Sequence, residues 1–347
     1  MPYKIIQYPN KIKFSKMEIQ IPRQFPDVMK GKKIMYVHGF GSSAQTGTVH
    51  RMRAMFPNAE VVARDMPVHP AEAIDLLHRL CETERPNLII GTSMGGMYTE
   101  QLYGFDRILI NPAFQIADTM REHGLTGKQQ FFNPREDGVQ EFYVDKALVK
   151  EYREVSERCF SAVSDDERRR VWGLFGDQDT LVHTFDLFCE HYTQAAHFHG
   201  EHRMDDRSFL HGVVPVIRWI DDRQEGRERP MVYIAVETLM DSGGRPASSM
   251  LKAVEMLIEN YQVYFVAQAP TNLHAYLSDI QTWIEQYVST LAHDHVVFTN
   301  RRDMLLGDYL IDVSPAKEFM GARIAFGSDE FKTWEDIIVY FQRLGGQ

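Results

Sequence analysis

The segment Gly91-Thr92-Ser93-Met94-Gly95 constrains this chain more than any other feature, because it places a serine between an apolar run and a helix-forming stretch. The apolar run Asn87–Ile90 predicts a strand, and residues 96–103 predict a helix. A turn this sharp holds the serine backbone in a sparsely populated conformation and leaves little room for flanking Cβ atoms. The pattern therefore predicts a strand–turn–helix elbow that exposes the Ser93 hydroxyl at a sheet edge.

The composition predicts two globular domains and argues against nucleic acid or an anionic membrane as a partner. A chain of 347 residues is longer than one core usually supports, and its 44% hydrophobic share suffices for two. The formal net charge is −10 without a basic run, whereas nucleic acids and anionic membranes require a basic surface. Residues 1–16 are polar instead of forming an apolar signal segment, and no run of about 18 apolar residues occurs. We expect a soluble, cytoplasmic protein.

The cysteine content indicates neither a disulfide framework nor a structural zinc site. The three cysteines, Cys81, Cys159 and Cys189, are odd in number and form no C-x-x-C pair. This usage fits a reducing cytoplasm, and no metal site is expected.

Predicted strands and helices alternate from residue 32 to residue 222, which is typical of a parallel sheet covered on both faces, an α/β fold. The predicted strands are Lys33–Val37, Ala59–Ala63, Leu88–Ile90, Arg107–Ile110, Val171–Phe175 and Ala195–His199, and the predicted helices include Val49–Met55, Pro70–Glu84 and Val213–Ile220. The polar segment from Pro112 to Arg170 is too long for an ordinary connection. We interpret it as a helical cap over an active site.

A charged segment without an apolar position, residues 221–230, marks the predicted domain boundary. We expect a first domain at residues 1–222, a linker at 223–230 and a smaller three-layer α/β domain at 231–347. The predicted strands of the second domain are Met231–Val236, Gln262–Ala267, Val296–Thr299, Tyr309–Asp312 and Ala322–Ala325, and its predicted helices are Ser248–Asn260, Leu273–Leu291 and Thr333–Leu344.

The residue types that activate a serine follow Ser93 in the order aspartate, then histidine, which is typical of the α/β-hydrolase fold. Asp179, in the turn after the fifth predicted strand, is the candidate that orients an imidazole, with Asp177 as the alternative. His202, directly after the sixth strand, is the candidate general base, with His211 as the alternative. These residues predict a Ser-His-Asp triad that requires no metal and no organic cofactor.

The glycine-rich loop His38–Ser43 follows the first strand and supplies the remaining part of such a site. Its backbone N–H groups can meet a developing oxyanion, and we predict the amides of Phe40 and Met94 as the donor pair. His38 and Gly39 are candidates to line the substrate pocket, although a histidine in such a loop can also fix its turn. Four aromatic cap residues are candidates for an apolar acyl pocket, and they could equally form the cap core. They are Phe114, Phe131, Phe132 and Tyr143.

Three segments together resemble the small bacterial esterases of the YqiA/YcfP type: Tyr36–Ser43, Gly91–Gly96 and Leu109–Ala113. The resemblance covers roughly residues 30–222. It implies a serine esterase acting on short acyl esters or thioesters. The cap of this chain is longer than in that family, so no substrate preference carries over.

The second domain resembles haloacid-dehalogenase-type domains, and most closely the cytosolic 5'(3')-deoxyribonucleotidases, in Met231–Val236, residues 264–270 and Gly307–Asp312. In that family the first strand ends in Asp-x-Asp, whose first aspartate attacks phosphorus while magnesium neutralises the phosphate. These positions read Ala235 and Glu237 here. Alanine cannot form a phosphoenzyme, so the resemblance implies a pseudophosphatase that is structural, holds a homodimer or binds a phosphorylated ligand without turning it over.

Other motif positions of the second domain are also altered. Ala267 stands where the family has serine or threonine, and Val313 stands where it has an aspartate. Polar roles remain for Asp308, Asp312 and one of the two arginines Arg301 and Arg302, and residual phosphatase activity through Glu237 or Asp241 is the rival interpretation.

Two functions of other classes stand beside the serine esterase that cleaves a small-molecule ester. One is a binding or scaffold protein in which both domains are catalytically silent. The other is a nucleotide phosphatase carried by the second domain, which Ala235 contradicts.

Overall fold

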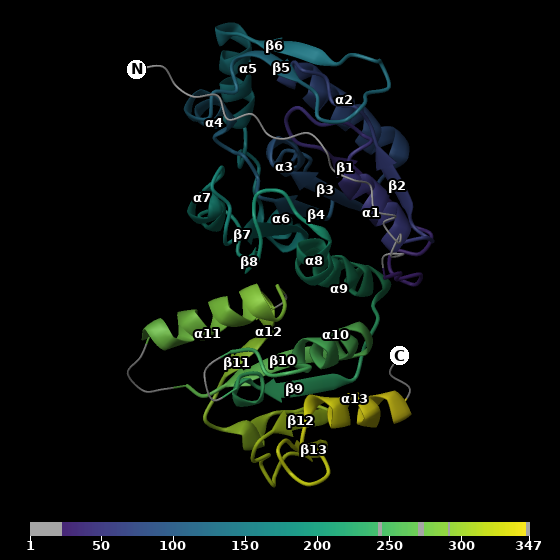
Figure 1. Ribbon diagram of the computed structural model, residues 1–347, viewed down its shortest axis with the longest axis vertical. Coiled ribbons are helices and arrows are strands. Elements are labelled where there is room, and N and C mark those ends of the chain that lie inside the picture. The colour runs from purple at the N-terminus through teal and green to yellow at the C-terminus, as the bar shows by residue number, and fades with distance from the viewer. Residues whose placement is uncertain (1–22, 242–244, 270–273, 291, 345–347) are drawn as a thin grey trace, which may run out of the picture.

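The computed structural model describes residues 23–241, 245–269, 274–290 and 292–344. The polar segment 1–16 and both ends of the predicted helix Leu273–Leu291 lie outside the described residues. Two parallel sheets, one of six and one of five strands, form two units arranged along the long axis of the molecule (Figure 1). This architecture confirms the predicted α/β class.

The first unit is built on a six-stranded sheet with the order β2-β1-β3-β4-β7-β8, in which all neighbouring strands are parallel. Its strands are β1 (Lys33–Val37), β2 (Glu60–Ala63), β3 (Leu88–Thr92), β4 (Arg107–Ile110), β7 (Val171–Gly176) and β8 (Ala195–Phe198). Its main helices are α1 (Gly47–Met55), α2 (Pro70–Glu84), α3 (Met94–Glu100) and α9 (Val214–Glu225). Successive residues of β1 pack into different cores, Met35 and Val37 into one, Ile34 and Tyr36 into the other. The sheet is therefore covered on both faces, as its continuous apolar strands require.

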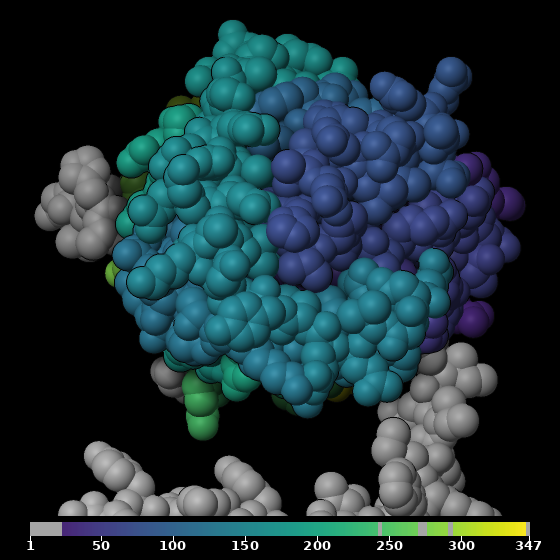
Figure 2. Space-filling view, turned by 90° about the horizontal axis from the view of Figure 1, so that it is seen from above, coloured from purple at the N-terminus to yellow at the C-terminus, as the bar shows by residue number. Residues whose placement is uncertain are grey.

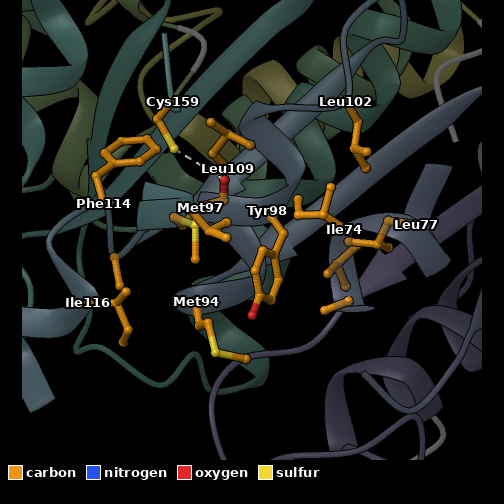
Figure 3. Close-up of a cluster of buried hydrophobic side chains, with 14 of the residues drawn as sticks. Ile74, Leu77, Met94, Met97, Tyr98, Leu102, Leu109, Phe114, Ile116 and Cys159 are labelled. Carbon is orange, nitrogen blue, oxygen red and sulfur yellow. Dashed lines mark hydrogen bonds between the residues drawn. The ribbon is translucent and has the colours of Figure 1, made fainter. Parts of the chain in front are cut away.

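Helix α3 is buried at every position from Met94 to Glu100. Met97 and Tyr98 are fully buried and lie in one cluster with Leu109 of β4 and with Cys159 (Figure 3). The Cys159 thiol donates a hydrogen bond to the Met97 carbonyl at 3.5 Å. Close packing on all sides fixes the helix that follows the serine.

The cap between β4 and β7 combines helices with a hairpin. Its elements are α4 (Ile116–Glu122), β5 (Gly127–Gln130), β6 (Glu141–Val144), α5 (Lys146–Ser156) and α6 (Asp165–Arg170). Asp145 accepts a hydrogen bond from Leu148 N and thereby begins α5. The prediction of helices here is right, but the antiparallel pair β5–β6 was not predicted, because its first strand reads Gly-Lys-Gln-Gln.

The second unit is built on a five-stranded parallel sheet with the order β11-β10-β9-β12-β13. Its strands are β9 (Met231–Ala235), β10 (Gln262–Ala267), β11 (Val296–Phe298), β12 (Tyr309–Asp312) and β13 (Ala322–Ala325). Its helices are α10 (Met250–Asn260), α11 (His274–Tyr287), α12 (Ala292–His295) and α13 (Trp334–Arg343). Short helical segments complete the chain: α7 (Phe185–Cys189), α8 (Asp206–Ser208), η1 (Phe209–Val213), η2 (Val236–Thr238) and η3 (Arg302–Met304).

The junction between the two units is ordered and charged. Helix α9 extends to Glu225, so the first three residues of the predicted linker 223–230 are helical. Arg227 and Arg229 both bind Asp222, with nitrogen-to-oxygen distances of 3.0 and 2.7 Å. These ion pairs hold the connecting segment against the end of α9.

The second unit covers β8, which is the edge strand of the first sheet (Figure 1). The His197 N–H of β8 donates to the Glu285 carboxylate of α11 at 3.2 Å. Thr290 Oγ1 donates to the Gly212 carbonyl at 2.6 Å, and Ile258 of α10 packs against the cores of both units. An exposed sheet edge invites pairing with other chains, and α11 shields this one.

All three cysteines are free: Cys81 and Cys159 are buried, and Cys189 is exposed. Burial raises the pKa of the Cys81 thiol to about 11, so this cysteine stays protonated. Within the described ranges, no helix is both long enough and apolar enough to cross a membrane.

Candidate active site

Ser93 stands between β3 and α3 with φ 54° and ψ −122°, a backbone conformation that non-glycine residues rarely adopt. The neighbouring glycines make this turn possible. A Cβ atom added to Gly95 would lie 2.1 Å from the Val37 carbonyl oxygen, and one added to Gly91 would lie 2.3 Å from Thr99 Oγ1. The elbow therefore depends on glycine at both positions, as the sequence pattern predicts.

Ser93, His202 and Asp179 form one hydrogen-bonded chain at the ends of β3, β8 and β7. His202 Nε2 lies 3.0 Å from Ser93 Oγ, and His202 Nδ1 lies 2.7 Å from Asp179 Oδ2. The other carboxylate oxygen accepts from the N–H groups of Leu181 at 2.7 Å and Val182 at 3.1 Å. With Nδ1–H donating to the carboxylate, Nε2 is left to accept the serine proton.

The environment of Asp179 keeps this carboxylate charged. Its burial alone would raise the pKa, but the hydrogen bond and charge of His202, together with the backbone donors of Leu181 and Val182, hold the pKa of Asp179 below its usual value. A charged carboxylate next to Nδ1 stabilises the imidazolium that forms when His202 takes a proton.

The two alternative residues have other partners. Asp177 Oδ2 lies 3.0 Å from His199 Nδ1, and Asp177 Oδ1 accepts from Gly200 N at 2.9 Å. His211 Nδ1 lies 2.8 Å from a carboxylate oxygen of Glu255, which belongs to α10 of the second unit. The structure thus brings Asp179 and His202 to Ser93, and it engages Asp177 and His211 elsewhere.

The predicted oxyanion donors lie on two segments that pack against each other. Met94 is the first residue of α3, so its N–H has no acceptor within the helix. Among the described residues, the N–H groups of Met94 and Phe40 donate to no protein acceptor. A Cβ atom added to Gly39 would lie 3.2 Å from Ser93 Cβ, so the loop after β1 passes directly beside the nucleophile.

His38 is buried and does not line a substrate pocket, which corrects that prediction. Its Nε2 accepts from the Met66 N–H at 2.9 Å, and its Nδ1 donates to the Gly39 carbonyl at 2.9 Å. Burial lowers the pKa of His38, so the ring is neutral. Both ring nitrogens are used to hold the loop, in agreement with the turn-fixing alternative.

The four aromatic pocket candidates have different surroundings. Phe114 is 4% exposed and packs on Phe160 with ring centroids 4.7 Å apart, so it belongs to the cap core (Figure 3). Tyr143 is 67% exposed on β6, which contradicts its assignment to a pocket. Phe131 is half-buried, with its ring 4.5 Å from the ring of Phe142.

Phe142 was not predicted to take part, although its ring packs on Phe40 of the His38–Ser43 loop. The ring centroid of Phe142 lies 5.2 Å from that of Phe40. The ring centroid of Tyr152, on α5, lies 6.4 Å from that of Phe40. The alternation of β6 places Phe142 inward and Tyr143 outward. The unrecognised strand is therefore the reason for this error.

Phe132 and Asn133 join the two loops on either side of the serine. The Phe132 N–H donates to the Gly41 carbonyl at 2.7 Å, and Asn133 Nδ2 donates to Ser42 Oγ at 3.1 Å. On the other side, the Arg203 guanidinium lies 4.7 Å from the centroid of the Phe132 ring. Phe132 is 63% exposed, so it contacts both loops from the surface and is not buried between them.

Asn111 positions the loop that carries His202, a role that the sequence did not reveal. Its Oδ1 accepts from Gly176 N at 2.7 Å, and its Nδ2 donates to the carbonyls of Glu201 at 3.3 Å and His202 at 3.1 Å. Its backbone has φ 44°, which asparagine tolerates better than most residues. The available signal was the Asn-Pro pair directly after β4.

A separate groove of about 540 Å³ lies between the cap and α2. Figure 2 shows this end of the molecule, where the teal cap segments lie beside the blue segments that contain α2. Val68, Leu76 and Phe131 contribute to its lining, and no residue of the Ser93–His202–Asp179 chain does.

The active-site positions predicted in the second unit fall into two groups. Ala235 ends β9 and is fully buried, and Glu237 and Asp312 both bind Arg302. Asp308 instead accepts from Met231 N at 2.7 Å, at the beginning of β9. At the carboxyl ends of the strands, polar roles therefore remain for Asp312 and Arg302. Asp308 lies at the amino ends of the strands instead.

A six-stranded parallel sheet with a serine elbow, followed by a cap, an aspartate turn and a histidine loop, defines the first unit as an α/β-hydrolase fold. Residues 33–200 match the sequence profile of the family described as Uncharacterised protein family (UPF0227). This match and the relatives below confirm the two-part resemblance predicted from the sequence.

The curated relatives are similar to a part of the chain. A provisionally named 5'(3')-deoxyribonucleotidase of Vibrio phage KVP40 is 28% identical over 137 residues, which is 38% of this chain and 76% of that protein. A provisionally named 5'(3')-deoxyribonucleotidase of Staphylococcus epidermidis is 30% identical over 107 residues, which is 27% of this chain. The chain spans 58% of the length of that staphylococcal relative.

The solved structures that resemble the chain include esterases and lipases. A monoacylglycerol lipase of Paleococcus ferrophilus is 16% identical, with 58% of this chain and 96% of that chain covered and a TM-score of 0.39. Est1E from Butyrivibrio proteoclasticus is 16% identical, with 58% and 91% covered and a TM-score of 0.37.

Proposed function

We propose that the first unit is a serine hydrolase that cleaves small acyl esters or thioesters through an acyl-enzyme. The observation that carries this proposal is the continuous hydrogen-bonded chain from Asp179 through His202 to Ser93 on a strained elbow. The turn presents the Ser93 hydroxyl at the end of β3, and His202 lies within hydrogen-bond distance as a base. Exposure of the hydroxyl and a neighbouring base are what a nucleophilic serine needs.

The proposed reaction begins when Ser93 Oγ attacks the carbonyl carbon of the ester and His202 Nε2 takes the serine proton. The negative charge that develops on the carbonyl oxygen is bound by the N–H groups of Phe40 and Met94. The tetrahedral intermediate collapses, the C–O or C–S bond breaks, and the imidazolium protonates the leaving group. A water molecule, deprotonated by His202, then attacks the acyl carbon. The bond between this carbon and Ser93 Oγ breaks, the imidazolium returns its proton to Oγ, and the acid is released.

For the second unit we propose a structural role as a domain of its own, residues 231–347, beside a hydrolase domain at 1–222. Support comes from Glu285 of α11, which accepts a hydrogen bond from His197 of the edge strand β8, and from Ile258, which packs in both cores. Small acyl esters as substrates, a cytoplasmic location and a homodimer remain predictions.

The proposed function is tested by labelling the purified full chain with a fluorophosphonate probe, which reacts with activated serines. We expect labelling of the wild type, none of Ser93→Ala, and wild-type labelling of the matched control Ser161→Ala, an exposed serine in the cap. Turnover of p-nitrophenyl acetate or butyrate should be lost in Ser93→Ala only. Equal labelling and turnover in Ser93→Ala and the wild type would refute the assignment, and an unlabelled wild type would favour a scaffold protein.

A further inference from the structure

The second sheet has a cleft of about 630 Å³ at the carboxyl ends of its strands. Ligands of α/β folds bind at this edge, so the side chains that line it decide what the unit can do. Glu237 follows β9, Asn300 follows β11 and Asp312 ends β12, and all three line the cleft together with Arg302. The cleft therefore gathers two carboxylates and one guanidinium at neighbouring strand ends.

Arg302 binds both of these carboxylates at once. Its Nη2 lies 2.8 Å from Glu237 Oε1 and 2.9 Å from Glu237 Oε2, and its Nη1 donates to Asp312 Oδ2. The side chain of Asp312 is 1% exposed, and its other oxygen accepts from Ser314 N at 2.9 Å. A buried carboxylate needs an opposite charge close by, and for Asp312 that charge is supplied by the guanidinium.

The magnesium ion that the family resemblance implies does not fit these residues. Magnesium prefers octahedral oxygen ligands that include one or two carboxylates. Here Ala235 offers no side-chain oxygen, and the oxygens of Glu237 and Asp312 that face Arg302 are already used. In the part of the chain that the structure describes, no three His, Cys, Asp or Glu residues are grouped so that they could hold a metal ion.

We propose that Arg302 is the permanent cation of this cleft, a charge attached to the chain that balances Glu237 and Asp312 in place of a metal ion. The second unit then folds independently of magnesium. Among the described residues that line the cleft, no cation is left for a phosphate, because Glu237, Asp303, Asp312 and Glu318 stand against one arginine, Arg302. This charge balance argues against the predicted binding of a phosphorylated ligand.

The proposal is tested on the full chain by comparing Arg302→Gln with Arg301→Gln, a matched control whose exposed guanidinium binds Asp303 instead. The probe is Mn²⁺, followed by electron paramagnetic resonance, with thermal unfolding measured in parallel. We expect no saturable Mn²⁺ binding by the wild type or Arg301→Gln. Arg302→Gln should melt about 5 °C or more below the wild type, because it leaves the buried carboxylate of Asp312 without an opposite charge.

Saturable Mn²⁺ binding by the wild type that Asp312→Asn abolishes would overturn the proposal. An Arg302→Gln variant that melts like the wild type would also overturn it. If Arg302→Gln does not fold, the double variant Arg302→Gln/Asp312→Asn should fold, since it no longer buries an unpaired charge. Failure of the double variant to fold would contradict the charge-balancing role.

Discussion

Strands β3 and β9 each stand third in the order of their parallel sheet, and a candidate site lies at the carboxyl end of each. The two sites differ in the partners of their polar groups. Ser93 after β3 has φ 54°, whereas Ala235 at the end of β9 has an ordinary extended backbone with φ −67° and ψ 128°. At the first site, among the described residues, the N–H groups of Phe40 and Met94 donate to no protein acceptor, while at the second Arg302 binds the carboxylates of Glu237 and Asp312. A parallel sheet thus provides the location, and the residues at its strand ends decide which chemistry can take place there.

The largest expected effect concerns His202, the histidine of the first site. We expect His202→Ala to lower kcat/KM for p-nitrophenyl butyrate by roughly 10⁴-fold or more, because the serine loses its base. His211→Ala is the matched control and should retain wild-type turnover, since His211 binds Glu255 at the junction. The reverse ranking of the two variants would identify His211 as the base.

The strain of the elbow can be tested through folding. Gly95→Ala should reduce the free energy of unfolding by about 3 kcal/mol or more, because its new Cβ would lie 2.1 Å from a backbone oxygen. Gly47→Ala is the control, with no atom within 4 Å of the added Cβ. Denaturant unfolding measures both, and equal midpoints for the two variants would show that the turn is not strained as described.

A smaller loss is expected at Asn111, which acts through the His202 loop. Asn111→Ala should lower kcat by about 10- to 100-fold with little change in KM, because the imidazole is misplaced while the substrate still binds. Asn111→Asp keeps the acceptor for Gly176 N and loses the donor to His202 O, so an intermediate kcat is expected. A change in KM alone would assign Asn111 to substrate binding.

The smallest predicted effect concerns pH and the junction. Burial raises the pKa of Glu285 to about 7, from an ordinary 4.5, so its protonated form stabilises the fold below pH 4.5 and this contribution is lost as the pH rises through 7. Glu285→Gln keeps an acceptor for His197 N but carries no charge. Its melting temperature relative to the wild type should therefore increase by a few degrees between pH 5 and pH 8. A constant difference would show that Glu285 does not titrate in this range.

Much of the fold could be predicted because the strands are continuous apolar runs. The bounds of β1, β4, β10, β12 and β13 were predicted to the residue, and polar residues follow the first three of these strands directly. The order of strands also placed a histidine and an aspartate near Ser93. The first strand of the hairpin β5–β6 reads Gly-Lys-Gln-Gln and gave no such pattern, so the alternation that separates Phe142 from Tyr143 was not recognised.

What the sequence could not reveal are contacts between distant residues. Arg302 and Glu237 are 65 residues apart, and Asn111 and His202 are 91 apart, so no local spacing relates them. The hydrogen bonds of His38 likewise depend on Met66, which belongs to the next connection. Residue types at strand ends indicate where chemistry can occur, whereas the pairing of charges there requires coordinates.

The packing of Ile258 in both cores has a consequence for how such a chain can change. A gene shortened to encode the first unit alone would produce a protein whose last strand, β8, has lost its covering helix α11, with the His197 N–H left without its Glu285 acceptor. Selection can then preserve the surface of the second unit for the contacts it makes with the first. We expect substitutions to be rejected along the face of α11 that contacts β8.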